Sequence, residues 1–70
     1  MEKKFTHITI DGVEHQIVRY GGGDVVVDHP SLPGQPCARH LLSESELNNL
    51  FGGASIRTGG HVYSRVKISY

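Results

Sequence analysis

Hydrophobic and polar residues alternate along the first part of the chain, and two turn signals divide that part into three segments. Asp11-Gly12 lies between two alternating segments, which is the strongest short-range signal for a β-hairpin. A run of glycines at 21–23 then separates Ile17–Tyr20 from Asp24–Val27. The pattern predicts three consecutive antiparallel strands.

The hairpin register assigns each side chain of the first two strands to one face of the sheet. A two-residue loop pairs Ile10 with Val13 and Ile8 with His15, and directly opposed residues share a face. The face expected to form the core carries Ile8, Ile10, Val13, His15 and Ile17. The opposite face is expected to be polar near the turn, with His7, Thr9, Glu14 and Gln16. Towards its other end the same face is expected to expose an apolar patch of Phe5, Val18 and Tyr20.

The length of the glycine loop decides which valines of the third strand face the core. A two-residue loop would direct Val26 inwards, whereas a three-residue loop over 21–23 directs Val25 and Val27 inwards beside Ile17. Burial of one valine contributes about 1.5–3 kcal/mol, which favours the register that buries two of them. We therefore predict the three-residue loop.

Residues 30–40 contain three prolines at a spacing of three, Pro30, Pro33 and Pro36. Proline has no backbone N–H, and this spacing matches the repeat of a polyproline II helix. Such a segment could be a ligand for an aromatic groove of another domain, although ligands of that kind normally occupy flexible tails. We predict instead that 30–40 is a rigid, irregular crossing from the third strand to a helix.

A short helix is predicted next, because Ser43 and Glu46 have the spacing of a capping box. Leu42, just before the cap, is expected to pack on Leu47 as a hydrophobic staple. The face expected to be buried carries Leu47, Leu50 and Phe51. Two glycines follow and end the helix. Two turns are too short to be stable alone, so the helix is expected to pack on the sheet.

The C-terminal part of the chain predicts one or two further strands. Ala54–Thr58 is interpreted as a brief strand, and a diglycine turn leads from it into a final strand over His61–Tyr70. The final-strand residues expected to face the core are Val62, Val66, Ile68 and Tyr70. The fold class predicted for a single domain 1–70 is α+β. It is a small antiparallel sheet of four to five strands in β-β-β-α-β-β order, with one short helix packed on one face.

Composition and charge exclude several classes of protein. Seven basic and seven acidic residues cancel, which disfavours non-specific binding to nucleic acid. No apolar run approaches the roughly 20 residues of a membrane span, and the first residues lead directly into a strand, so we expect neither a membrane segment nor a signal peptide. Cys37 is the only cysteine and cannot form an intramolecular disulfide, which is typical of a reducing compartment. We expect a cytoplasmic protein.

The sequence contains five histidines, which raise three hypotheses: a zinc site, a pH-sensitive pair and a catalytic Cys–His pair. A zinc hypothesis takes His29, Cys37 and His40 as ligands, with His15 or His61 as the fourth. Structural zinc sites use paired ligand motifs at both ends, which this set lacks, so we expect neither metal nor cofactor.

A second hypothesis is a pH-sensitive pair, because the three-residue loop sets His29 opposite His15. Cys37 and His40 have no orienting Asn or Asp nearby, so no enzyme activity is expected.

The predicted apolar patch indicates a binding function. Exposed apolar patches on small proteins usually mark interaction sites. The predicted contact residues are an anchor of Phe5, Val18 and Tyr20, a polar rim of His7, Glu14 and Gln16, and a second surface of Tyr63, Arg65 and Lys67. We predict a protein-binding regulator or inhibitor that masks a surface of a larger partner, such as a phage-encoded anti-defence or host-takeover protein. An edge strand offers a further route, to a homodimer.

The alternative prediction is a small module that binds single-stranded RNA through the exposed face of the last strand. Tyr63 would stack on a base there, while Arg65 and Lys67 would contact phosphates. Against this stands the ordinary interpretation of such a stripe as a solvated outer face that keeps a sheet soluble.

Overall fold

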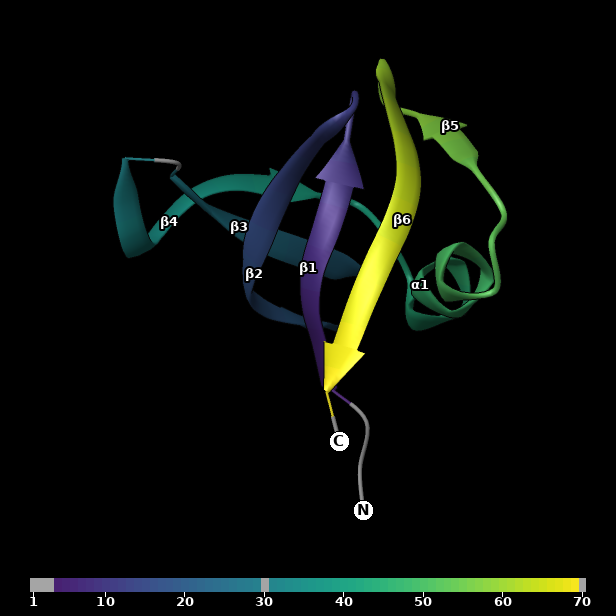
Figure 1. Cartoon of the computed structure of the whole chain (residues 1–70), viewed down its shortest axis with the longest axis horizontal. Coiled ribbons are helices and arrows are strands. Elements are labelled where there is room, and N and C mark those ends of the chain that lie inside the picture. Colours follow the sequence, from purple (N-terminus) through teal and green to yellow (C-terminus); the bar gives the residue numbers. More distant parts are fainter. Residues whose placement is uncertain (1–3, 30, 70) are drawn as a thin grey trace.

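The computed structural model describes residues 4–29 and 31–69, which form one antiparallel six-stranded sheet curled into a half-barrel, with one short helix (Figure 1). The elements in chain order are β1 (Lys4–Ile10), β2 (Val13–Gly21), β3 (Asp24–His29), β4 (Leu32–His40), α1 (Glu44–Phe51), β5 (Ile56–Thr58) and β6 (His61–Ser69). Their order across the sheet is β4-β3-β2-β1-β6-β5, so β4 and β5 are the edge strands. An antiparallel sheet with one helix is confirmed, but the strand number and order differ from the prediction.

The first hairpin follows its turn signal. Asp11 and Gly12 have φ angles of 52° and 82°, the left-handed pair that a two-residue type I′ turn requires. Ile10 pairs with Val13 and Ile8 with His15, as the loop length predicts. This register is confirmed because it depends only on neighbouring residues.

The prediction that 30–40 is irregular is wrong, because Leu32–His40 is a nine-residue strand paired antiparallel with β3. Its position explains why prolines are tolerated: β4 is an edge strand, so only one side of its backbone takes part in the ladder. The register also shifts beside Pro36, and residues 33–35 stand between two consecutive pairs without partners on β3. Pro30 lies outside the described residues.

Three β-bulges interrupt the alternation on which the face assignments depended. One extra residue is inserted at Thr6 in β1, at Val18 in β2 and at Ser64 in β6, relative to the facing strand in each case. An inserted residue exchanges the two faces for every residue beyond it. The predicted faces are therefore correct for residues 7–17 and for β6 from Arg65 onwards, and they are reversed at Phe5, at Tyr20 and at the first three residues of β6.

The bulges in β1 and β2 bury the predicted apolar patch. Phe5 is only 1% exposed and Tyr20 is half-buried, and their rings meet edge-on with centroids 5.2 Å apart. Val18, the inserted residue, is 36% exposed. The prediction of an exposed Phe5, Val18 and Tyr20 surface is therefore wrong, because Phe5 belongs to the core and Tyr20 packs against it.

The bulge in β6 exchanges the predicted faces of the residues at the beginning of that strand. Tyr63 is 2% exposed and faces the core, although it was predicted to lie on the outer surface. Val62 was predicted to face the core and is 37% exposed. Val66 is buried and Ile68 packs against the core, as predicted. Tyr70, also predicted to face inwards, lies outside the described residues.

The glycine loop is shorter than predicted, yet the predicted valines are buried. Gly21 pairs with Asp24, which leaves a two-residue turn rather than three. The bulge in β2 compensates for the missing loop residue, so Val25 and Val27 still join the core, at 0% and 2% exposure. The loop prediction is wrong and its packing consequence is confirmed.

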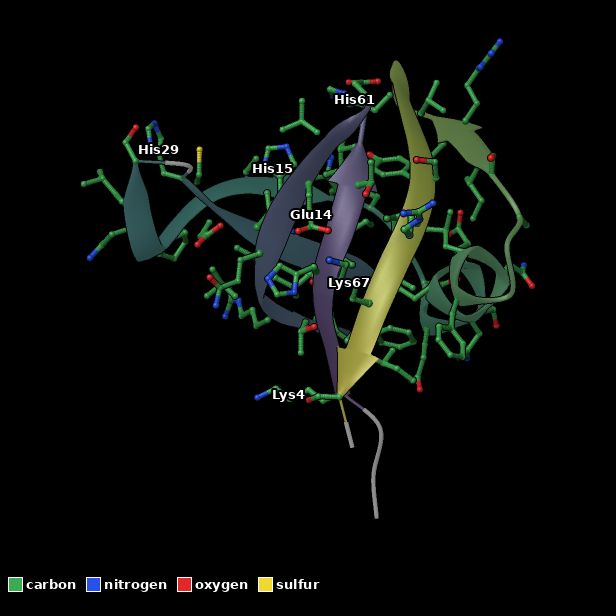
Figure 2. All side chains as sticks on the ribbon, in the orientation of Figure 1. Lys4, Glu14, His15, His29, His61 and Lys67 are labelled. Atoms are coloured by element: carbon green, nitrogen blue, oxygen red, sulfur yellow. The ribbon has the colours of Figure 1, made fainter. Side chains whose placement is uncertain are left out.

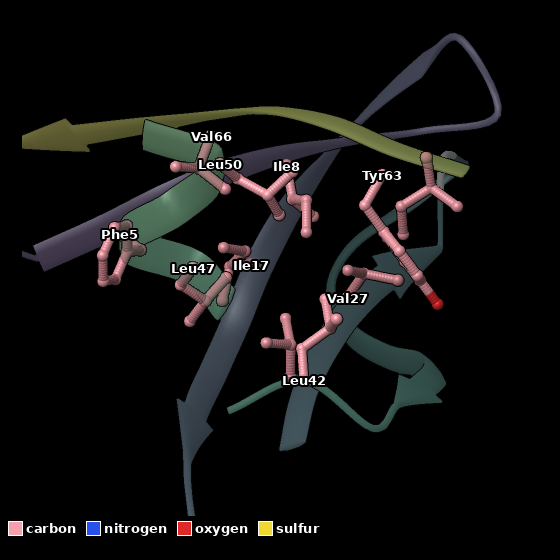
Figure 3. Close-up of a cluster of buried hydrophobic side chains, with 11 residues drawn as sticks. Phe5, Ile8, Ile17, Val27, Leu42, Leu47, Leu50, Tyr63 and Val66 are labelled. Carbon is pink, nitrogen blue, oxygen red and sulfur yellow. The ribbon is translucent and has the colours of Figure 1, made fainter. Parts of the chain in front are cut away.

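The helix forms at the predicted capping box. The Ser43 hydroxyl accepts the N–H of Glu46, whose carboxylate accepts the N–H of Ser43. Leu42, Leu47 and Leu50 are at most 2% exposed, whereas Phe51, predicted to be buried, is 48% exposed. Figure 3 shows the leucines of α1 among the side chains of β1, β2 and β6. The core cluster comprises Phe5, Ile8, Ile10, Ile17, Val25, Val27, Leu42, Leu47, Leu50, Tyr63 and Val66.

Two further predictions concern the remaining elements. The brief strand predicted at Ala54–Thr58 is confirmed for Ile56–Thr58, which pairs with the beginning of β6. Within the part of the chain that the structure describes, no helix has both the length and the apolar character required to span a membrane.

Candidate functional site

A pocket of about 370 Å³ opens on the concave side of the sheet, beside the turn that joins β1 to β2. No residue of α1 lines it, so it lies where the helix does not cover the sheet. We call it the histidine pocket. It is lined by Ile10, Asp11, Val13, His15, Val27, Asp28, Cys37, Ala38, His40 and His61. Its volume is in the range of small-ligand sites in proteins.

A second hollow of about 390 Å³ adjoins the first and separates the two edges of the sheet. Residues 38–41 form its β4 side, and Thr58, Gly59, His61 and Tyr63 form the opposite side. We call this hollow the seam. Leu41 at its rim is 74% exposed, the most exposed large apolar side chain among those described. The half-barrel is therefore open between β4 and β5.

A cluster of rings stands where the pocket and the seam meet. The ring centroids of His40 and His61 are 5.2 Å apart, and those of His40 and Tyr63 are 5.5 Å apart. Burial, followed by the charges of His61 and His15, lowers the pKa of His40. Burial also raises the pKa of Tyr63, so its phenol stays protonated. The Tyr63 hydroxyl and Nδ1 of His40 are joined by a hydrogen bond of 2.8 Å.

Asp11 ties the first turn of the sheet to the last strand. Its Oδ2 accepts Nδ1–H of His61 at 2.7 Å, and its Oδ1 accepts the N–H of Val62 at 2.9 Å. Its own N–H donates to the carbonyl of Val62 at 2.8 Å. The hydrogen bond from His61, followed by the bond from Val62, lowers the pKa of Asp11. The ionised carboxylate holds the His61 ring at the mouth of the pocket.

Asp28 is the unusual polar residue of the pocket. It is 7% exposed and is the only buried charged side chain among the described residues. In the part of the chain that the structure describes, neither a side-chain hydrogen bond nor an ion pair reaches its carboxylate. No Lys or Arg is among the described residues that line the pocket. Asp28 is therefore a buried acidic residue of the lining that has no basic neighbour there.

The remaining predicted contact residues gather on the convex face. His7 pairs with Gln16 on one side and with Lys67 on the other, and Thr9 pairs with Glu14 and with Arg65. Glu14 Oε2 and Lys67 Nζ are 3.0 Å apart, and Figure 2 shows them side by side on this face. The predicted rim and second surface thus form one polar surface of His7, Glu14, Gln16, Arg65 and Lys67. Tyr63, buried on the opposite side, is not part of it.

The structure separates the histidines that were predicted to meet. His29 lies beside the turn between β3 and β4, away from His15 (Figure 2), and its Nδ1 accepts the N–H of Ser31 at 3.1 Å. The predicted pairing of His15 and His29 is absent because the ladder between β2 and β3 ends at Ile17 and Val27, which have the predicted register, and does not extend to the two histidines. Among the described residues, no group of three or more His, Cys, Asp or Glu is placed to hold a metal ion. Cys37 makes no hydrogen bond with any described residue.

Sequence reasoning missed the contacts between distant residues. Asp11 and His61 are 50 positions apart and meet because the end of β1 lies beside the beginning of β6. Both residues adjoin the turn glycines of their hairpins, a signal that becomes useful only once β1 is known to pair with β6. Asp28 directly follows three valines. Because a strand so rich in valine is usually buried, its position in the sequence was a signal that the Asp28 side chain is buried as well.

Comparisons with protein families, with curated proteins and with solved structures find no match to this chain. The functional argument therefore rests on the geometry of the pocket and the seam.

Proposed function

We propose that this chain is a protein-binding module that holds a segment of a larger partner in the seam and thereby masks that part of the partner. The observation that carries the proposal is the open concave side between the two sheet edges, with Leu41 exposed at its rim. Val13, 54% exposed, stands at the histidine pocket. A segment that covered both side chains would remove apolar surface from water.

The free edge of β4 supports the same proposal. Its outer backbone groups have no neighbouring strand in the described sheet, and residues 37–40 contain no proline. An extended segment could add to this edge through backbone hydrogen bonds while its side chains enter the seam. The opposite edge, β5, has only three residues and offers less backbone for pairing.

A regulatory or inhibitory role is part of the proposal, because a small module that covers a surface acts by blocking it. A phage-encoded protein directed against host machinery is the setting that we propose for a chain of this size. The alternative of single-stranded RNA binding stays a prediction. It rests on Arg65 and Lys67 alone, since Tyr63 is buried and cannot stack on a base.

The test compares Leu41→Ser in the seam with Leu32→Ser, a matched change at the other end of β4, where the leucine is 56% exposed. Tagged protein is incubated with host-cell lysate, and the retained proteins are quantified by mass spectrometry. Loss of one buried leucine at an interface should reduce retention of a stoichiometric partner by about tenfold or more. Leu32→Ser should retain the partner as the unchanged protein does.

Three results would contradict this function. The first is equal retention by both variants, and the second is loss confined to Leu32→Ser. The third is a light-scattering mass of two chains that only Leu41→Ser reduces to one, which would make a second copy the occupant of the seam.

A further inference from the structure

The strand registers decide which side chains point into the histidine pocket. Val27 pairs with Ile17 on one side and with Ala38 on the other, and directly opposed residues share a face of the sheet. Ile10 pairs with Val13 in the same way. Ile10, Ile17 and Val27 belong to the core on the concave side, so Val13 and Ala38 lie on that side as well. The floor of the pocket is therefore aliphatic, with Val13 at its exposed rim.

Three imidazole rings complete the wall of the pocket. His15 pairs with a core residue of β1, and His40 pairs with a core residue of β3, so both rings lie on the concave side. His61 stands two positions before the buried Tyr63 in β6 and shares its face. The rings of His40 and His61 meet edge-on, with centroids 5.2 Å apart. Aromatic rings favour such contacts, so a further ring entering the pocket would find partners on its wall.

The charges near the pocket are either already bonded or directed elsewhere. Both carboxylate oxygens of Asp11 form hydrogen bonds, one with the His61 ring and one with the N–H of Val62. Asp28 follows Val27 in an uninterrupted strand, so alternation directs its side chain to the opposite face. No Lys or Arg lines the pocket among the described residues. A charged group that entered would lose water without gaining a counter-charge, whereas a neutral apolar side chain would cover the aliphatic floor.

We infer that the histidine pocket receives one aromatic side chain of the partner protein, which packs on the aliphatic floor and against the imidazole rings. The pocket volume of about 370 Å³ lies in the range of sites that hold small ligands. The assignment of the ring to the partner rests on the proposed function of the seam, which shares Ala38, His40 and His61 with the pocket. The preference for a neutral ring rests on the pocket alone.

The test is a nuclear magnetic resonance titration of the isotope-labelled protein with N-acetyl-phenylalanine amide. A bound ring shifts the resonances of nearby methyl groups, so saturable changes are expected at Val13, Val27 and Ala38 and not at Leu32. N-acetyl-leucine amide, which is also bulky and apolar but has no ring, should bind about two- to tenfold more weakly, as expected for the loss of ring–ring contacts. N-acetyl-arginine amide should give no saturable shifts at the pocket.

Substitutions in the protein locate the binding. Ala38→Leu enlarges a side chain on the floor and should abolish saturable binding of the phenylalanine amide. Val13→Ser removes an apolar side chain from the rim and should weaken binding by about threefold or more. Val18→Ser, at another partly exposed valine of β2 that does not line the pocket, should leave binding unchanged. The spectrum of each variant without ligand shows whether it is folded, and the two serine variants keep the test decisive if Ala38→Leu does not fold.

Several results would overturn the inference. They are the absence of saturable shifts at the pocket, equally tight binding of the leucine or arginine amide, unchanged binding by folded Ala38→Leu, and equal binding by Val13→Ser and Val18→Ser. A light-scattering mass of two chains that Ala38→Leu reduces to one would make a second copy the source of the ring and would overturn its assignment to the partner.

The outcomes also separate this inference from the proposed function. If Leu41→Ser loses the partner while the phenylalanine amide does not bind, the seam function stands and the aromatic site is wrong. If binding of the phenylalanine amide depends on Val13 while Leu41→Ser retains the partner, the aromatic site stands and its assignment to a partner in the seam is wrong.

Discussion

The two ends of the curled sheet contrast sharply, although the same strands run through both. At one end α1 presses Leu47 and Leu50 against Phe5 and Ile8, and all four are at most 2% exposed. At the other end no part of α1 lines the histidine pocket, and Val13 is 54% exposed. An eight-residue helix is only about 12 Å long, whereas a nine-residue strand such as β6 extends over about 30 Å. The helix is too short to cover both ends, so its position separates core from site.

The two ends also differ in what holds them together. The covered end is packed with apolar side chains (Figure 3). The open end is connected by polar contacts, from Asp11 to His61 and Val62 and from His40 to Tyr63. Apolar packing should therefore dominate the stability of the molecule, and the polar contacts should position the pocket.

The largest effect is expected at the covered end. Phe5→Ala leaves a cavity in the core and should lower the free energy of unfolding by about 3–5 kcal/mol, a large part of the total for a chain of this size. Urea denaturation followed by circular dichroism measures the change. Val18→Ala, in the bulge of β2, is the control and should cost less than about 1 kcal/mol. Similar losses in both variants would contradict the assignment of Phe5 to the core.

An intermediate effect is expected at the start of the helix. Ser43→Ala removes the side-chain half of the capping box and should lower the free energy of unfolding by about 0.5–2 kcal/mol. Hydrogen exchange should show faster opening of α1 and of the strands beneath it. Ser45→Ala, an exposed position within the helix, serves as the control. If both serines proved equally dispensable, the cap would not be what holds α1 over the core.

The smallest effect is expected at the open end and depends on pH. The pKa of His40 lies below its ordinary value of 6.5 because burial and the charges of His61 and His15 disfavour the protonated ring. As pH falls below about 6.5, the unfolded chain therefore binds more protons than the folded one. The contribution of His40 to the free energy of unfolding should be fully present above that pH and should be lost as pH falls towards the lowered folded-state pKa.

Thermal melts between neutral and mildly acidic pH test this dependence. His40→Gln should flatten the decline towards acid, whereas His29→Gln, at an exposed position away from the ring cluster, should leave it in place. A decline that is the same in the unchanged protein and in His40→Gln would assign it to other groups.

The candidate site was predictable only in part. The convex residues Glu14, Gln16, Arg65 and Lys67 are exposed, as the alternation indicated. The patch built on Phe5 and the stacking role of Tyr63 failed because each depended on counting past a bulge. The histidine pocket was not predicted, since its lining comes from strands that are far apart along the chain.

The sequence by itself determined the features that depend on neighbouring residues. Asp11-Gly12 specifies a two-residue turn through its left-handed backbone, and Ser43 with Glu46 specifies the start of the helix through reciprocal hydrogen bonds. Only the tertiary structure decided that the proline segment is an edge strand and that Phe5 and Tyr63 face inwards. Edge position and bulges arise from pairing between distant strands, and local alternation carries no information about that pairing.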